Sequence, residues 1–469
     1  MTTNSNKNGF YIGVSCPGCG GELELEADFF TLTCKYCGSI LRVKMPETPP
    51  AFMIKAKVEP REIRFGIDRY LKSKNLPLTD SGFQTKYFYY PYWKVNALLL
   101  KVRNKMYEKV VSEESDYQDR VVLQKPKTEI GISPYLGTVS AGRDFEGIPD
   151  TIGLRTEYVR MIPFSAENIQ VGYDSLPVIK SIDAVWTEVV SSVMSVGGIA
   201  GPDFGTNLTE LMHPEYELVY FPYCIVEDYS RGGFNRFIVD GLSGRVVKHL
   251  TALTGDEQAL EPETTPVEFG KLDIDFHRCY NCGVDLPDEK SIVYICKNCQ
   301  VLNILENIHI PFDEIAKVDS ESKETDLMLP FWSLKTPAAL VPLVGRLFGG
   351  LHRSDRIVVP AFKAANFEAL YRLSKRMSAA VGQFKMTQAI NFDRRFRPVN
   401  LRLSEAVTLA NVLIYREQLD KRAAFTNKVE RVEFKPTEAG LFFAPFHHEN
   451  YFYVDSTFNA VTFEKTLVS

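Results

Sequence analysis

The stretch that decides the fold reads His277-Arg278-Cys279-Tyr280-Asn281-Cys282-Gly283, and it is followed by Cys296-Lys297-Asn298-Cys299. Each Cys-x-x-Cys segment turns two sulfur atoms toward one point, and about 13 residues separate the two segments. Four thiolates at this spacing indicate a tetrahedral zinc site held on two short turns, which we call knuckles. A glycine directly after Cys282 suits a tight turn whose N–H groups point at sulfur.

The same pattern stands near the start of the chain. Cys16-Pro17-Gly18-Cys19-Gly20 is followed, about 14 residues on, by Cys34-Lys35-Tyr36-Cys37-Gly38. Disulfides or free thiols are the alternative, and a second copy at matching spacing argues against both. The sequence therefore predicts two structural zinc ions, with these ligands: Cys16, Cys19, Cys34 and Cys37 in the first site, and Cys279, Cys282, Cys296 and Cys299 in the second. Four sulfur ligands close a site and leave no position for water activation.

The composition is that of an ordinary globular protein, with 45% hydrophobic and 24% charged residues in 469. Eight of the nine cysteines lie in the knuckles, which favours a reducing compartment and hence the cytoplasm. The first residues, 1–8, are polar and lack the apolar core of a signal peptide. We also find no uninterrupted apolar run of about 18 residues, so no transmembrane segment is expected.

An apolar run that ends in proline and an aromatic residue recurs along the chain. After the first cysteine pattern these runs contain Pro91, Pro163 and Pro222, and after the second they contain Pro330, Pro360 and Pro445, which we match in that order. Pro91 inside an aromatic strand predicts an edge, a bulge or a strand start. A hairpin with a left-handed turn residue closes each series: 237–246 with Gly244, and 452–461 with Asn459. A helix is expected before each last proline, from about 181 and from about 403.

These repeats predict an α+β fold built from two tandem copies of one unit, a small four-cysteine zinc ribbon followed by an antiparallel-sheet module with a packed helix. The alternative is chance recurrence of proline and aromatic residues. We expect these boundaries: zinc ribbon 1 at 10–45, module 1 at 51–253, an acidic, proline-containing linker at 254–276, zinc ribbon 2 at 277–305, and module 2 at 306–469.

No nucleotide-binding loop or catalytic motif is present in the sequence, so we do not expect an enzyme. The glycine-rich segment 197–201 lacks the lysine of a phosphate loop and is interpreted as an ordinary loop. His447-His448-Glu449 could supply metal ligands, but a solvent-exposed turn is the simpler interpretation. His277 could replace a thiolate in a ribbon that already has four. Cys224, in an apolar strand, is interpreted as a small buried hydrophobe rather than a nucleophile.

The charge distribution leaves two functions open. The net charge is −5, yet segments 54–110 and 344–436 carry a positive excess. Solvated faces and linkers explain most such segments, docking of acidic on basic segments is a second interpretation, and nucleic-acid binding stays open as an alternative function. The residues between the knuckles are acidic, including 22–28, and would repel phosphate. Nucleic-acid binding would require these side chains to cluster on one face: Arg372, Lys375, Arg376, Arg394, Arg395 and Arg397.

The Cys-x-x-Cys-Gly ribbon, the "YYPYW" and "LPFW" strands at 89–93 and 329–332, and the "VDGLSGRVV" hairpin at 239–247 resemble a family of bacterial zinc-ribbon proteins with YxPFW-type β modules. Members are often labelled as general-transcription-factor-type zinc ribbons. Some are linked to phage-shock and flotillin-like membrane-stress systems, which they recruit or scaffold. Such relatives often carry transmembrane segments after the module. Since none is expected here, the resemblance implies at most peripheral association with a membrane.

Together these observations predict a non-enzymatic, zinc-stabilised adaptor or scaffold that binds protein partners, in a bacterial membrane-stress or membrane-associated complex. Nucleic-acid binding through 54–110 and 344–436 is the alternative. The aromatic residues Trp93, Trp332, Tyr92 and Phe331 are assigned to the module cores, with an aromatic peptide groove as the second interpretation.

Overall fold

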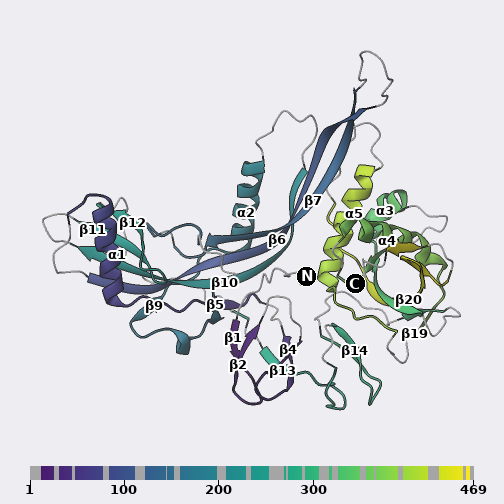
Figure 1. Ribbon diagram of the computed structural model, residues 1–469, viewed down its shortest axis with the longest axis horizontal. Helices are drawn as coiled ribbons and strands as arrows, with labels where there is room; N and C mark the ends of the chain where they lie inside the picture. Colours follow the sequence, from purple (N-terminus) through teal and green to yellow (C-terminus); the bar gives the residue numbers. More distant parts are fainter. Residues whose placement is uncertain are drawn as a thin grey trace. The chain divides into compact units, whose positions relative to one another are not determined.

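The computed structural model describes residues 12–25, 31–44, 48–77, 84–110, 122–143, 145–152, 159–197, 208–228, 234–252, 269–270, 273–287, 291–305, 316–319, 326–348, 355–363, 366–388, 395–420, 432–457 and 461–464 (Figure 1). The chain divides into two compact units: Met1–Leu99 with Ser133–Ile199 and Pro214–Phe276, and Leu100–Ile132 with Ala200–His213 and His277–Ser469. Over the described residues the fold is mixed α+β, mostly sheet, with five α-helices. The predicted class is therefore confirmed.

The first unit contains the first ribbon, made of a two-stranded and a three-stranded antiparallel sheet. The strands are β1 (Ile12–Ser15) with β2 (Glu22–Leu25), and β3 (Thr31–Thr33), β4 (Ile40–Lys44) and β13 (Asp273–Phe276). Strand β13 lies within the segment 254–276, which the sequence predicted to be a linker. Residues 253–268 of that region lie outside the described residues.

Strand β13 adds apolar contacts and ion pairs to the first ribbon. Ile274 and Phe276 pack onto the cluster that contains Leu41, Cys16 and Cys34. The alternate residues of β13 face basic residues of β4: Arg42 bonds Asp275 at 3.1 Å, Lys44 bonds Asp275 at 3.1 Å, and Lys44 bonds Asp273 at 3.4 Å. Opposite charges at cross-strand positions fix which strand pairs with β4 and in which register.

The larger sheet of the first unit has eight strands. They are β5 (Ala51–Met53), β6 (Gln84–Val110), β7 (Val122–Ser140), β8 (Ile162–Pro163), β9 (Tyr173–Ser175), β10 (Leu208–Asp228), β11 (Asn235–Asp240) and β12 (Val246–Leu250). Helix α2 (Ile182–Gly197) and the 3-10 turn η2 (Ala166–Asn168) belong to the same unit. The long strands β6, β7 and β10 also contribute residues to the second unit.

Helix α1 (Pro60–Ser73) covers β11 and β12 (Figure 1). Proline at the first helical position has no N–H to leave unpaired, and the Glu62 carboxylate accepts a hydrogen bond from the Glu59 N–H at 2.9 Å. Ile63, Ile67 and Leu71 recur every four residues and are buried against the sheet. The start signal and the apolar period of this segment thus specify the same helix.

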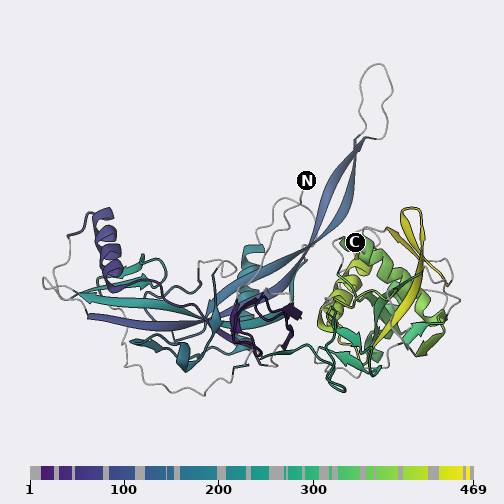
Figure 2. The same ribbon diagram turned by 60° about the horizontal axis from the view of Figure 1, so that its bottom comes forward.

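The second unit contains the second ribbon and a seven-stranded sheet. The strands of the ribbon are β14 (Val293–Ile295) and β15 (Leu302–Ile304). Those of the sheet are β16 (Ala316–Val318), β17 (Leu327–Lys335), β18 (Arg356–Pro360), β19 (Met386–Gln388), β20 (Ala439–Glu449), β21 (Phe452–Asp455) and β22 (Thr462–Glu464). In Figure 2 the yellow strands β21 and β22 form a hairpin, in agreement with their antiparallel pairing.

Three helices accompany this sheet: α3 (Val341–Phe348), α4 (Phe367–Ala380) and α5 (Leu403–Asp420), with 3-10 turns η4 (Ala338–Leu340) and η5 (Val381–Gln383). Helix α4 packs on β18 and contributes Leu370, Leu373 and Met377 to the core of the sheet. Its N-cap is Asn366, whose side chain accepts a hydrogen bond from the Ala369 N–H at 3.1 Å.

Four of the recurring prolines use their carbonyl oxygens in the same way. Each accepts a hydrogen bond from the first residue beyond a neighbouring strand: Ala141 N to Pro91 O at 3.0 Å, Gly241 N to Pro222 O at 2.9 Å, Ala361 N to Pro330 O at 2.9 Å, and Ser456 N to Pro445 O at 2.9 Å. In an antiparallel sheet the N–H and C=O of one residue point toward the same neighbouring strand. At each of these prolines that neighbouring strand has just ended, so no ladder hydrogen bond is lost by the missing N–H. Pro91 therefore lies inside β6 and not at the start of the strand, at a point where the neighbouring strand β7 has ended.

The matched prolines Pro163 and Pro360 occupy different places. Pro163 lies in β8 opposite Phe52, whereas Pro360 ends β18 opposite Phe331. This part of the sequence match is wrong, because an apolar run ending in proline suits any strand whose neighbour turns away. Strand β19, which pairs antiparallel with β16, holds the place that β8 holds beside β5.

The aromatic residues assigned to the module cores are buried: Trp93, Tyr92, Trp332 and Phe331 are all at most 2% exposed. The indole N–H of Trp93 donates to the Lys180 carbonyl oxygen at 2.9 Å, and that of Trp332 donates to the Leu401 carbonyl oxygen at 2.9 Å. Core packing is thus confirmed for these four side chains, and they do not form a peptide groove.

Candidate metal centres

All four knuckles have the same pair of backbone hydrogen bonds. The N–H of the first cysteine donates to a carbonyl five residues on: Cys16 to Gly21 at 2.8 Å, Cys34 to Ser39 at 2.9 Å, Cys279 to Val284 at 2.9 Å, and Cys296 to Val301 at 3.0 Å. The carbonyl of the first cysteine accepts from the N–H four residues on, at 2.9 Å in each case: Gly20, Gly38, Gly283 and Gln300. These bonds close the turn and hold both sulfur atoms on one side.

The residue that follows each second cysteine has a left-handed backbone. The φ angles are +71° at Gly20, +73° at Gly38, +73° at Gly283 and +58° at Gln300. Three of the four positions hold glycine because it adopts this conformation without steric cost. Gln300 is the exception to glycine at this position. Its residue type does not predict the left-handed backbone that it shares with the three glycines.

The sulfur atoms form two tight groups of four, and within each group all ligand atoms lie within 4.8 Å of one another. Two sulfur–sulfur distances in each group are known: 3.7 Å for Cys16–Cys37 and 3.8 Å for Cys19–Cys34, and 3.6 Å for Cys279–Cys299 and 3.4 Å for Cys282–Cys296. A tetrahedral ion with metal–sulfur bonds of about 2.3 Å requires sulfur atoms about 3.8 Å apart. The eight predicted ligands therefore come together, four and four, in an arrangement that could hold two metal ions.

In the first centre, polar groups lie close to two of the sulfur atoms. The Gly18 N–H donates to Cys16 Sγ at 3.4 Å, and the Ser39 hydroxyl lies 3.3 Å from Cys37 Sγ. The Ser39 hydroxyl and backbone N–H lower the pKa of Cys37 to about 6. A thiolate is the form that binds a metal, so these donors prepare the ligand.

In the second centre, the side chain of Asn303 donates a hydrogen bond to a ligand sulfur atom, and this side chain is only 3% exposed. Its Nδ2 donates to Cys279 Sγ at 3.5 Å and to the Val301 carbonyl at 2.9 Å, while its Oδ1 accepts from the Tyr280 N–H at 3.0 Å. Burial opposes ionisation of Cys279, but the Cys282 N–H and the Asn303 amide lower the pKa of this thiol to about 6. Asn303 was not predicted from the sequence; the signal was a polar residue within the apolar strand 301–304.

The other metal candidates lie outside these groups. His277 is fully buried with its ring edge-on to Tyr294, at 4.7 Å between centroids, and is not among the ligand atoms that gather at the second centre. His447 and His448 belong to β20 rather than to the predicted turn, because the strand continues to Glu449 and turns at Asn450 (φ +50°). His447 Nδ1 lies 3.2 Å from Ser456 Oγ.

Cys224 is fully buried in β10, where burial raises the pKa of its thiol to about 12. It is therefore a neutral apolar side chain near neutral pH, as the sequence predicted. Segment 198–201 of the predicted glycine-rich loop and Asn459 of the predicted hairpin turn lie outside the described residues.

The basic residues proposed for nucleic-acid binding are partly engaged inside the protein. Lys375 Nζ lies 2.5 Å from Oε1 of the buried Glu417, and Arg395 is half-buried. Arg372, Arg376 and Arg397 are exposed. Arg394 lies outside the described residues. The described part of this set thus presents fewer available cations than its sequence suggests.

The tips of the ribbons expose tyrosines. Tyr36 is 60% exposed and Tyr280 is 71% exposed, each between the two cysteines of a knuckle. A Cβ at Gly21 would overlap the ring of Tyr36, so glycine allows this ring to lie against the knuckle. Lys35 Nζ lies 5.3 Å from the centroid of the same ring.

Comparison with family models, with curated proteins and with solved structures gives no match to this chain. None of the described helices combines the length and the apolar character needed to cross a membrane. The two four-cysteine centres and the surfaces beside them are therefore the basis for inferring the function.

Proposed function

We propose that the protein is a non-enzymatic adaptor whose two ribbons are each stabilised by a structural zinc ion. The observation that carries this proposal is the combination, in both ribbons, of four sulfur ligands with an exposed tyrosine at the knuckle. Four thiolates fill every position of a tetrahedral ion, so zinc bound there supplies folding energy rather than an open coordination site. An exposed aromatic side chain on a rigid turn is suited to binding a partner protein.

We further infer that the chain contains two tandem copies of one unit. The support comes from hydrogen bonds that recur in the same order in both sheets: proline carbonyl to chain turn, tryptophan indole to the segment before a helix, and the closing hairpin. In each case the helix begins two residues after the carbonyl that the indole binds, at Ile182 and at Leu403. Two similar units suit a scaffold, because they offer related surfaces on one chain.

The partners of such an adaptor are proteins in the cytoplasm, and the resemblance to membrane-stress proteins directs the search to membrane-associated complexes. Nucleic-acid binding is the second candidate. It is favoured by the positive excess of 54–110 and 344–436, and disfavoured by the internal pairing of Lys375 with Glu417.

The experiment is affinity capture of the full chain from its native host, with and without nuclease, followed by mass spectrometry. A double variant, Tyr36→Ser with Tyr280→Ser, is compared with Tyr451→Ser, which changes an 81% exposed tyrosine away from the knuckles. We expect partners that survive nuclease, persist with Tyr451→Ser and are lost with the double variant. Loss of every partner on nuclease treatment would establish the nucleic-acid alternative, and equal capture by all variants would exclude the knuckles.

A further inference from the structure

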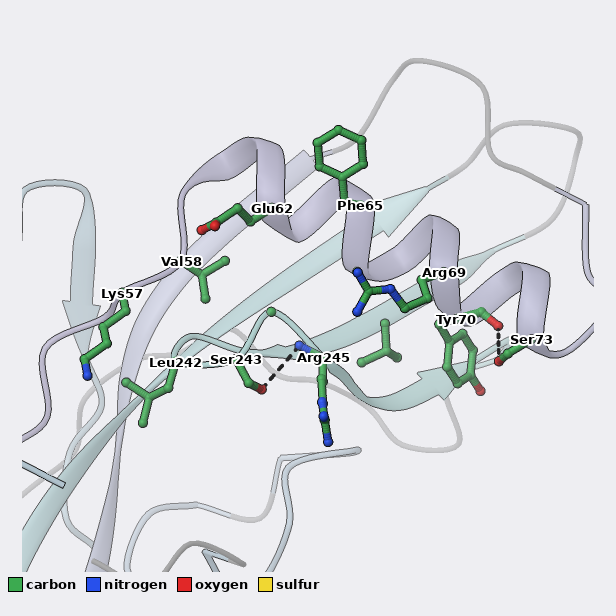
Figure 3. A pocket seen from close by; sticks show the side chains of 13 residues that line it. Lys57, Val58, Glu62, Phe65, Arg69, Tyr70, Ser73, Leu242, Ser243 and Arg245 are labelled. Atoms are coloured by element: carbon green, nitrogen blue, oxygen red, sulfur yellow. Dashed lines mark hydrogen bonds between the residues drawn. The ribbon is translucent and has the colours of Figure 1, made fainter. Parts of the chain in front are cut away.

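A groove of about 810 Å³ lies between helix α1 and the turn that joins β11 to β12 (Figure 3). The helix and the turn meet at two glycines: a Cβ on Gly66 would overlap the carbonyl oxygen of Gly244. Because neither residue carries a side chain, the backbones touch and the space beside this contact stays open. Gly244 also has a φ of +66°, which favours glycine at the turn.

The turn itself is rigid. Asp240 Oδ1 accepts hydrogen bonds from the N–H groups of Leu242 at 2.7 Å and Ser243 at 3.0 Å, and the Asp240 carbonyl accepts from the Gly244 N–H at 2.9 Å. On the other side, the Lys57 N–H donates to the Gly241 carbonyl at 2.9 Å. The walls of the groove are thus formed before any ligand binds, which lowers the entropy cost of binding.

Three exposed cations line the groove: Lys57, Arg69 and Arg245. Figure 3 shows Arg69 on the helix, Arg245 on the hairpin, and Lys57 toward the end marked by Leu242. Within the described residues no ion pair involves any of the three. The acidic residue of the lining, Glu62, accepts the hydrogen bond from the Glu59 N–H at the start of the helix.

Apolar side chains lie between these charges. Val58 and Leu242 are half-buried in the lining, and Phe65 is 67% exposed on the helix. A ligand that covered this ring would gain hydrophobic free energy in proportion to the apolar area removed from water. The lining therefore combines a net positive charge, three cations against one carboxylate, with apolar surface.

We propose that this groove binds an acidic peptide segment of a partner protein. Its carboxylates pair with Arg69, Arg245 and Lys57, and its apolar side chains cover Phe65 and Leu242. This inference rests on the proposed adaptor role and names the chemical class of one partner. Arginine suits the role because its planar guanidinium can bind a carboxylate through two hydrogen bonds.

A peptide fits better than a phosphate polymer. Glu59 and Glu62 place carboxylates at the N-terminal end of α1, and Asp68 adds a third acid to the helix. A continuous polyanion that follows the helix would meet these acids. A short peptide can instead space its acids so that they face the three cations and not the acids of the helix; Arg69, for example, lies about 10 Å along the helix from Glu62.

The test is selection of a random 12-residue phage-display peptide library on the full chain. The most enriched peptide is then synthesised with a fluorescent label, and its binding is measured by anisotropy. The groove variant is Arg69→Glu with Arg245→Glu. The matched control is Arg61→Glu with Lys72→Glu, which makes the same charge change on exposed residues of α1 that do not line the groove. Circular dichroism verifies that both variants fold.

We expect enrichment of peptides that combine Asp or Glu with apolar residues. The groove variant should weaken binding by at least about tenfold, the control by less than about threefold, and Phe65→Ala by an intermediate factor. Neutral or basic selected peptides, no enrichment, or equal binding by both variants would overturn the proposal. So would displacement of the peptide by inorganic phosphate or by a uridine homopolymer, since either would identify a phosphate site.

This result is separable from the adaptor role itself. If affinity capture with the Arg69→Glu, Arg245→Glu chain returns the same nuclease-resistant partners in the same amounts, the groove is not a docking site while the adaptor proposal stands. If no nuclease-resistant partner is captured by the native chain, the adaptor proposal fails, whatever the peptide selection shows.

Discussion

Asn303 holds in the second ribbon the position that Leu41 holds in the first, four residues after the last cysteine ligand. Leu41 is fully buried and Asn303 is 3% exposed. A buried amide costs free energy unless its donors and acceptor are paired. Three hydrogen bonds pair those of Asn303, and one of them reaches the sulfur of Cys279. The two ribbons thus stabilise their ligands differently, although their cysteine patterns match.

At this residue we predict a selective loss of metal. Asn303→Asp replaces a donor to sulfur with an acceptor and adds negative charge beside four thiolates. The zinc affinity of the second site should fall by roughly 10- to 100-fold, the usual range for a residue that orients a ligand. Chelator competition measures it, and the first site of the same chain is the control. Equal loss from both sites, or from neither, would contradict the assigned role of Asn303.

The sequence identified the eight cysteines whose sulfur atoms come together, because each Cys-x-x-Cys turn places two sulfur atoms on one side. The sequence did not predict the hydrogen bond from Asn303 to Cys279 or the left-handed backbone of Gln300. A polar residue in a strand suggests a surface-facing side chain until its neighbours are known, and a left-handed non-glycine residue is imposed by the knuckle rather than favoured by its side chain.

Among the elements, β13 could not be placed from the sequence. Its four residues alternate acidic and apolar side chains after an acidic, proline-containing segment, which indicates a linker. The alternation is explained only by the partner strand β4, where Lys44 and Arg42 pair with Asp275. The contact with Lys44 is the main cause that lowers the pKa of Asp275. Ile274 and Phe276 then complete the core of the first ribbon.

We predict that β13 supports the first metal centre. Ile274→Ala with Phe276→Ala removes apolar contacts at Cys16 and Leu41, so the first site should lose zinc to a chelator about tenfold faster. Asp273→Asn is the control: its ion pair with Lys44 is exposed and contributes little stability. Unchanged zinc loss in the double alanine variant would show that the ribbon is complete without β13.

Strand β12 carries a group whose titration should affect stability. The ring of His249 stacks on Phe237, with centroids 4.4 Å apart, and meets the edge of the Tyr70 ring. Burial lowers the pKa of His249, so the folded state disfavours the protonated ring. The penalty is absent above the unfolded pKa of about 6.5 and appears as the pH falls below it.

The free energy of unfolding of the first unit should therefore decrease between about pH 7.5 and about pH 5.5, the range that spans the unfolded pKa. His249→Phe keeps an aromatic ring on Phe237 and removes the titration, so its decrease over the same range should be smaller. Urea denaturation at both pH values provides the comparison. The same decrease in both proteins would assign the pH dependence to other groups.

At the scale of the whole molecule, the proline-aromatic runs predicted strands but not their neighbours. Pro222 and Pro445 take equivalent places, as do Pro91 and Pro330, because each lies where an adjacent strand ends. Pro163 and Pro360 both end a short apolar run but occupy different positions in their sheets. A proline in a strand indicates that the adjacent strand ends beside it. Which strand is adjacent depends on pairing between segments that are far apart in the sequence.

Removal of the metal should unfold the ribbons and leave the sheets folded. Each sheet has its own apolar core, around Tyr90, Tyr92 and Phe221 in the first unit and around Phe331, Leu373 and Phe442 in the second. The ribbons contain small clusters in which the cysteines themselves are core residues. Domains this small depend on the metal for folding.

We therefore predict about two zinc ions per chain in anaerobically purified protein, counted by native mass spectrometry and elemental analysis. Cys282→Ala with Cys299→Ala should leave one ion, bound at the first centre. A strong chelator should release both ions from the native chain. Hydrogen exchange should then become fast at Cys16, Cys34, Cys279 and Cys296 and stay slow in β10 and β20, since strand cores keep their own contacts. Iron in place of zinc would redirect the function toward redox chemistry, and unfolding of the sheets together with the ribbons would show that the metal centres stabilise the whole chain.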